Sequence, residues 1–285
     1  MTPGQRAEAL VAELGITDAK DLDVEAIAFD SGVMVEYQKL TGCEATLAGF
    51  GDKAIATIKK SSIRGRDRYS IGHELGHWKM HRGRSFRCRV DDPDENFAPD
   101  RILEKEADQF AAHLLMPGNI FDPAIKSLGQ PGFREIEVLA EQFQTSLLAT
   151  SIRLANINSL PVIVACYSLL GLHWHVTASD IPRRWFLRDK LDSDSFAYDL
   201  ITNGIRPAAT PRKQSGEVWF ENDDAEEYDM MEHCTSYHNG KLLVVLYLTP
   251  NMLTAKFDPS VGNRRYTESG SYVPSRLSKK ISSSI

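Results

Sequence analysis

The stretch YSIGHELGHWKMHR, residues Tyr69–Arg82, constrains this chain more than any other part of the sequence. His73 and His77 are four residues apart, so a helix places both on one face, where two imidazoles can bind one metal ion. Glu74 completes the pattern H-E-x-x-H, in which the glutamate acts on a metal-bound water and does not bind the metal. The stretch therefore predicts a helix with two metal ligands and a general base.

The residues around these histidines fit a helix that is packed inside the protein. Ile71, Leu75 and Trp78 supply an apolar face. Gly72 and Gly76 are poor helix formers, so we expect them to allow a close approach of another element. His81 lies one further turn along the helix, which predicts a supporting or surface position for it, not a third metal ligand.

A second helix is expected over LEKEADQFAAHLLMP, residues 103–117, because its apolar residues recur at helical spacing. Glu104 and Asp108 are four residues apart and share a face. We expect Glu104 to be the third metal ligand and Asp108 to orient a histidine from outside the ligand shell. Glu106 is an alternative ligand, although on a helix it points well away from Glu104.

Together, GHELGHWKMH and EKEADQFAAHLLMP resemble the ImmA/IrrE family of zinc metallopeptidases, over about residues 5–155. The resemblance implies a Zn²⁺ ion bound by His73, His77 and Glu104, with Asp108 in the Asn/Asp place of the family motif. It also implies a partner. Family members typically cut a DNA-binding repressor, often encoded beside them, and so switch on stress, mobile-element or anti-phage genes.

Composition allows two compact domains, because the chain has 285 residues of which 42% are hydrophobic. The net charge of −6 argues against nucleic-acid binding by the protein as a whole. Two basic clusters, residues 59–68 and 82–89, nevertheless flank the predicted metal helix. They are either solvated loops or a basic rim that binds an acidic substrate segment or an activator such as single-stranded DNA.

The expected compartment is the cytoplasm. The sequence has no apolar run near the roughly 20 residues of a membrane span, and MTPGQRAEAL does not read as a signal peptide. The cysteines are too widely spaced for a disulfide framework or a structural zinc motif, which suits a reducing environment. They are Cys43, Cys88, Cys166 and Cys234.

The residues before the metal helix predict two helices, over 5–15 and 21–32, and then three strands. We expect these strands to form a small antiparallel sheet whose edge can pair with an extended peptide substrate. The strands are predicted over residues 33–40, 44–51 and 53–60.

Between the two ligand helices, residues 83–100 are polar, contain two prolines and are predicted to form a loop. Cys88 lies in this segment. A thiolate is a strong zinc ligand, so one hypothesis makes Cys88 an inhibitory fourth ligand that must leave before a water is activated. The alternative is an inert buried cysteine, which is the more frequent case.

Residues 133–158 predict two short helices broken near Gln144–Ser146, a pattern that resembles a helix-turn-helix. The resemblance to the family supports this, because its members often carry such a segment here. A DNA reader needs polar or basic residues on its second helix, and this one offers few. We therefore favour a packing role over base reading. The polar residues are Ser146, Thr150, Ser151 and Arg153.

The predicted fold class is α+β, with three parts. Residues 1–158 form a zincin-like metallopeptidase domain that includes the helix-turn-helix-like helices, 159–275 a GAF-like α+β sensor domain, and 276–285 a disordered tail. In the second domain we expect strands over 161–170, 172–178, 217–222 and 241–250, a helix over 194–204, and an acidic loop or helix end over 221–233. His173 and His175 share a strand face, where a hydrogen-bonded pair is favoured over a metal site.

The function predicted from these features is intracellular zinc-dependent proteolysis of a helix-turn-helix repressor, in response to a stress, DNA-damage or phage signal. Glu74 favours this reading, because a structural metal site needs no general base. Tyr69 and His81 are the candidates for stabilising the oxyanion. The alternative is a DNA- or ligand-binding transcriptional regulator whose metal site is not catalytic.

Overall fold

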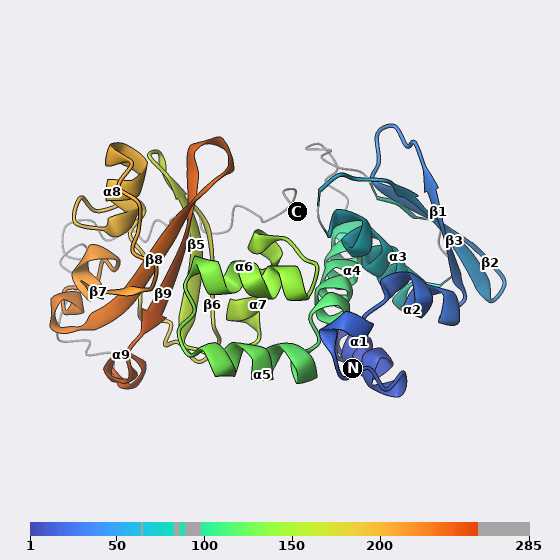
Figure 1. Ribbon diagram of the computed structural model, residues 1–285, viewed down its shortest axis with the longest axis horizontal. Helices are drawn as coiled ribbons and strands as arrows, with labels where there is room; N and C mark the ends of the chain where they lie inside the picture. The colour runs from blue at the N-terminus through green and yellow to red at the C-terminus, as the bar shows by residue number, and fades with distance from the viewer. Residues whose placement is uncertain (64, 83–85, 89–97, 256–285) are drawn as a thin grey trace. The chain divides into compact units, whose positions relative to one another are not determined.

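The computed structural model describes residues 1–63, 65–82, 86–88 and 98–255. The chain divides into two compact units, each described by itself below (Figure 1). Among the described residues, the first contains Met1–Ala124 and Val138–Arg153, and the second contains Ile125–Glu137 and residues 154–255. The predicted domain boundary after residue 158 stays a prediction, and the predicted disordered tail lies outside the described residues.

The first unit contains a four-stranded sheet in the order β1-β3-β2-β4. Alternate residues of β3 are buried, which is the pattern of a sheet with one face covered by helices. The strands are β1 (Val33–Gln38), β2 (Ala45–Phe50), β3 (Lys53–Lys59) and β4 (Phe86–Cys88).

The prediction of a purely antiparallel sheet is wrong for β1, which pairs with β3 in parallel. A tight turn at Gly51 and Asp52 joins β2 to β3 as an antiparallel hairpin. The hairpin leaves the far edge of β3 open to β1. Residues 39–44 link β1 to β2, which lies two strand spacings away, about 10 Å, on the other side of β3. β1 and β3 are therefore both antiparallel to β2 and run in the same direction.

The predicted loop between the ligand helices contains the short strand β4, which pairs with β2. The prediction of a loop was therefore wrong at Phe86–Cys88. The polar and proline-rich residues around it concealed a strand of this length, and its partner strand lies far back in the sequence.

The helices of the first half follow the predicted places closely. The helix predicted over 5–15 lies at Pro3–Glu13, where Thr2 and Gln5 form a capping box, and Gly15 follows with a φ of 68°. The helices are α1 (Pro3–Glu13), α2 (Val24–Asp30), α3 (Arg66–Met80), α4 (Ala98–Leu115), α5 (Gly118–Leu128), α6 (Phe133–Gln142) and α7 (Leu147–Asn156).

Helices α3 and α4 pack unusually close together through small residues. A Cβ atom added at Gly76 would lie 3.1 Å from the Ala107 Cα, and one at Gly72 would lie 3.4 Å from the Ala111 Cα. On the other side of α3, Trp78 is buried and donates a 2.9 Å hydrogen bond to the Ser31 carbonyl. Both glycines therefore lie where α3 and α4 approach each other closely, as the sequence predicted.

The break between α6 and α7 falls where it was predicted, and Gln144 there has a φ of 53°. The polar side chains of α7 are engaged within the protein: Thr150 and Ser151 are buried, and Arg153 donates to the Met116 carbonyl at 3.0 Å and to Glu8 at 3.0 Å. This burial fits the favoured packing role over base reading. A helix-turn-helix fold stays a prediction.

The second unit contains a five-stranded antiparallel sheet in the order β6-β5-β9-β8-β7. Its middle strand β9 is almost wholly buried, as its continuous apolar sequence predicted. The α+β class is thus present in both units, while the GAF-like identity stays a prediction. The elements are β5 (Val162–Ser168), β6 (Gly171–Thr177), α8 (Phe196–Asn203), β7 (Arg212–Ser215), β8 (Asp229–Tyr237), β9 (Lys241–Leu248) and α9 (Pro250–Thr254).

Two predictions for the second unit were wrong. Residues 217–222 form no strand: Gly216–Val218 is a short 3-10 helix, and Phe220 makes only an isolated bridge to Leu187. The predicted acidic loop contains the start of β8. Its Glu232 is buried and accepts hydrogen bonds from the Trp219 indole at 2.8 Å and the Ala197 amide at 2.9 Å, so an acidic residue serves the core.

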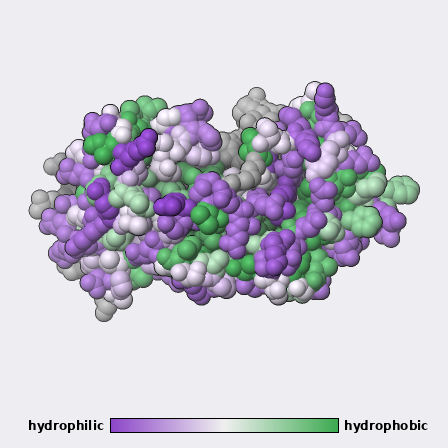
Figure 2. Space-filling model, in the orientation of Figure 1, coloured by the Kyte–Doolittle hydropathy of each residue, from purple (hydrophilic) through white to green (hydrophobic). Residues whose placement is uncertain are grey.

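None of the helices in the described part of the chain has both the length and the apolar character that crossing a membrane requires. The face in Figure 2 mixes hydrophilic and hydrophobic residues over both units.

The contact between α3 and α4 predicts opposite effects for two similar substitutions. Gly76→Ala should lower the free energy of unfolding, because overpacking against the Ala107 backbone costs about 1–3 kcal/mol. Gly72→Ala is the matched control. Its Cβ meets only ordinary contacts, so the helix propensity of alanine should leave stability unchanged or raise it by up to about 1 kcal/mol. Urea unfolding of both variants measures this. Equal stabilities would contradict the proposed packing constraint.

Candidate metal centre

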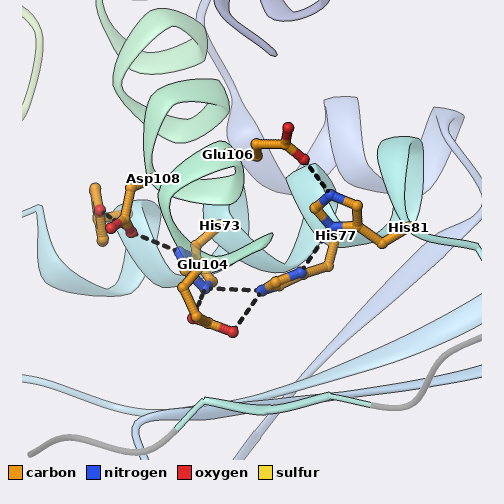
Figure 3. A network of polar contacts seen from close by, with 7 residues as sticks. His73, His77, His81, Glu104, Glu106 and Asp108 are labelled. Atoms are coloured by element: carbon orange, nitrogen blue, oxygen red, sulfur yellow. Dashed lines mark hydrogen bonds and ion pairs between the residues drawn. The ribbon is translucent and has the colours of Figure 1, made fainter. Parts of the chain in front are cut away.

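Helices α3 and α4 bring the three predicted ligands together (Figure 3). The Nε2 atoms of His73 and His77 lie 3.1 Å apart. The Glu104 carboxylate faces both, with 3.1 Å from Oε2 to the His73 Nε2 and 3.3 Å from Oε1 to the His77 Nε2. Among the described residues, this is the group of three or more His, Cys, Asp and Glu side chains that can hold a metal ion.

Burial and charge in this cluster suit a cation. Both histidines are buried, while the Glu104 side chain is 42% exposed, so one side of the cluster is open. Burial lowers the pKa of His77, although Glu104 opposes that shift. Burial raises the pKa of Glu104, but hydrogen bonds from His73 and His77 outweigh it and lower that pKa to about 2. A neutral His77 imidazole and an ionised Glu104 carboxylate therefore lie beside His73 at neutral pH.

Asp108 lies where the sequence placed it, against the far nitrogen of a ligand histidine. Its Oδ1 is 2.9 Å from the His73 Nδ1, and Tyr69 donates its hydroxyl hydrogen to the same oxygen at 2.6 Å. With a hydrogen on Nδ1 bonded to Asp108, the His73 ring can offer its Nε2 to a metal ion. The Tyr69 hydroxyl therefore supports Asp108, which speaks against its expected role as an oxyanion donor.

Glu74 follows His73 on the same turn of α3, and its side chain is fully buried. It is not part of the three-residue cluster, as the H-E-x-x-H pattern expects of a general base. Its catalytic role stays a prediction.

Glu106, the alternative ligand, lies outside the cluster. Its Oε2 is 2.8 Å from the His81 Nε2, and the His81 Nδ1 is 3.1 Å from the His77 Nδ1 (Figure 3). His81 thus contacts the back of a ligand histidine. The spacing of His73, His77 and His81 along one helix face was a signal for this contact, but the partner on α4 could not be read from the sequence.

The other predicted residues lie apart from this cluster. The backbone of Cys88 pairs with Ala45 in the sheet, and its side chain lies outside the described residues, so its inhibitory role stays a hypothesis. His173 bonds to the Ser168 hydroxyl at 2.9 Å, as expected of a satisfied histidine.

The first basic cluster is partly engaged within the protein. Arg66 forms an ion pair with Glu44 at 3.0 Å, and Arg68 donates to the Leu22 carbonyl at 2.9 Å. These contacts leave less free charge for a basic rim than the sequence implied. Arg64, Arg84 and Arg89 lie outside the described residues.

Comparison with known proteins agrees with this geometry. Residues 19–155 match the family model of the peptidase M78 family, described as the IrrE N-terminal-like domain. A Mycobacterium tuberculosis transcriptional regulator of known structure is similar in fold, with a TM-score of 0.56, 15% sequence identity, and coverage of 91% of this chain and 82% of that chain. No curated protein sequence matches the chain.

The geometry predicts metal-dependent stability. A divalent transition-metal ion at 100 times its dissociation constant should raise the free energy of unfolding by about 2.7 kcal/mol. His77→Ala should abolish this gain, and Asp108→Ala should weaken metal affinity about 10- to 100-fold by releasing His73. Gln109→Ala, an exposed neighbour on α4, is the control. Thermal unfolding with and without metal measures this. A His77→Ala protein that responds like the wild type would place the metal elsewhere.

Proposed function

We propose, from the premise that residues 19–155 of this chain belong to the IrrE N-terminal-like peptidase family, that the protein is a regulatory zinc endopeptidase. The observation that carries the proposal is the convergence of His73, His77 and Glu104 from two closely packed helices, with Glu74 buried beside His73. A site that served only structure would need neither an open side nor a neighbouring carboxyl group.

Zinc fits this set of donors. Catalytic zinc takes three protein ligands from imidazole and carboxylate groups and keeps one position open, and the exposed side of Glu104 provides the opening. Bound there, Zn²⁺ would supply Lewis acidity, which lowers the pKa of a coordinated water and polarises a substrate carbonyl.

The residues of the chain divide the remaining work. Glu74 takes the proton from the attacking water and passes it to the leaving amine of the cut peptide. Asp108 holds the His73 ring through a 2.9 Å contact, and Tyr69 holds Asp108. Glu104, with its lowered pKa, keeps a negative charge at the site across the physiological pH range.

The substrate we propose is a helix-turn-helix repressor in the cytoplasm, cut in response to a stress, DNA-damage or phage signal. The resemblance to the family supports this choice. The position of β4 at the end of its sheet adds support, because a terminal strand offers backbone groups to an extended peptide.

The proposed activator is single-stranded DNA, with the second unit as a candidate sensor. The basic clusters beside α3 support it, although Arg66 and Arg68 are engaged with Glu44 and Leu22. The alternative function, a transcriptional regulator with a non-catalytic metal, is less well supported, because the polar residues of α7 are buried.

The test is cleavage of a helix-turn-helix repressor of the kind that family members cut, by wild type and by Glu74→Gln, with and without single-stranded DNA. We expect wild type to cut and Glu74→Gln to lose at least about 10²-fold in rate, because the amide cannot take a proton. Glu74→Gln should bind Zn²⁺ like the wild type, since Glu74 is not a ligand. Electrophoresis and mass spectrometry of the products measure the rate and the cut bond.

Three outcomes discriminate the readings. Cleavage that needs Glu74 and rises with DNA supports the whole proposal. Cleavage without any response to DNA removes only the activator. Failure of zinc-loaded wild type to cut the repressor in either condition would favour the binding or sensing alternative.

A further inference from the structure

A second line of hydrogen bonds stands behind the metal cluster, on the side of His77 (Figure 3). The His77 Nδ1 lies 3.1 Å from the His81 Nδ1, and the His81 Nε2 lies 2.8 Å from the Glu106 Oε2. The His77 side chain is fully buried and that of His81 is 6% exposed, whereas that of Glu106 is 41% exposed. The line therefore runs from the buried ligand outward to a carboxylate near solvent.

The positions of the hydrogens in this line follow from donor and acceptor chemistry. A carboxylate only accepts, so the His81 Nε2 carries the hydrogen that bonds Glu106. In its neutral form the His81 imidazole has one N–H, which makes its Nδ1 an acceptor. It then accepts from the His77 Nδ1, and the His77 Nε2, which faces His73 and Glu104, is the nitrogen that a metal ion would bind.

We infer that His81 and Glu106 are positioning residues for His77, holding its ring in the orientation and tautomer that present Nε2 to the metal. The inference rests on the proposed function as a zinc site. His73 has the same kind of support from Asp108, one hydrogen bond away. His77 differs because its supporting carboxylate acts through an intervening imidazole.

The helix geometry explains why the support for His77 forms a relay, in which Glu106 acts on His77 through His81. His73 and His77 lie on successive turns of α3, and His81 follows as the residue that caps its C-terminal end, so the nearest group behind His77 is another histidine of the same segment. Glu106 reaches this histidine from α4, two residues after Glu104, and so lies away from the three ligands. A side chain at position 81 that offers no acceptor would remove this hydrogen bond from the Nδ1–H of the buried His77.

The first experiment compares His81→Leu with His81→Asn. Leucine fills the space but offers no acceptor, whereas the asparagine side-chain oxygen comes close to the place of the histidine Nδ1. Titration of metal-free protein with Zn²⁺ against a chromophoric chelator measures affinity. We expect His81→Leu to lose about 10- to 100-fold and His81→Asn to stay within about threefold of the wild type. Equal affinity of His81→Leu and wild type would overturn the inference.

Glu106 is tested in the same assay through Glu106→Ala. We expect it to weaken zinc binding in the wild-type background and to have little further effect in His81→Leu, because both residues act through one line of bonds. Full and additive losses from the two substitutions would contradict a relay.

A second measurement needs no variant. Long-range ¹H–¹⁵N spectra of the zinc-loaded wild type report which ring nitrogen carries the hydrogen. The relay requires a hydrogen on Nε2 of His81 and none on its Nδ1, which accepts from the His77 Nδ1. A hydrogen on the His81 Nδ1 would overturn the inference, even if His81→Leu failed to fold.

These readouts separate the inference from the proposed function. A wild type that binds Zn²⁺ but cuts no repressor would end the proposed function, while the zinc affinities and the tautomer spectra would still decide the relay. A wild type that binds zinc and cuts its repressor, together with a His81→Leu protein of unchanged affinity, would end the relay alone.

Discussion

The close contact of α3 with α4 is the constraint on which the candidate site depends. Two ligands come from one helix and the third from the other, so their convergence within 4.8 Å requires the backbones to approach closely. Gly76 meets the Ala107 backbone where a Cβ would already be tight. The short distance between the helices therefore favours glycine at position 76, at the cost of helix propensity in α3.

The same contact gives the site a buried and an exposed side. The histidines lie inside, where burial keeps His77 neutral by lowering its pKa, and Glu104 lies at the opening with a pKa lowered to about 2. Each imidazole is supported from behind by a carboxylate of α4, His73 directly by Asp108 and His77 through His81 by Glu106. Ligands held in this way are arranged before any metal arrives, which reduces the ordering that binding requires.

The sequence predicted most of this site because its signals are local. The spacing of H-E-x-x-H and of Glu104 with Asp108 is set by helix geometry alone, and so is the break at Gln144. The partner of His81, the parallel pairing of β1 with β3 and the strand β4 depend on contacts between distant segments, which periodicity does not encode. Glu232 shows a further limit, since an acidic run concealed a buried strand residue held by Trp219.

The most direct test of the account is X-ray absorption at the zinc edge of wild-type protein loaded with one equivalent of Zn²⁺. The account predicts two imidazoles in the first shell, with nitrogen and oxygen ligands at about 2.0–2.2 Å. A shell with fewer than two imidazoles, or one dominated by sulfur at about 2.3 Å, would contradict a site built from His73, His77 and Glu104.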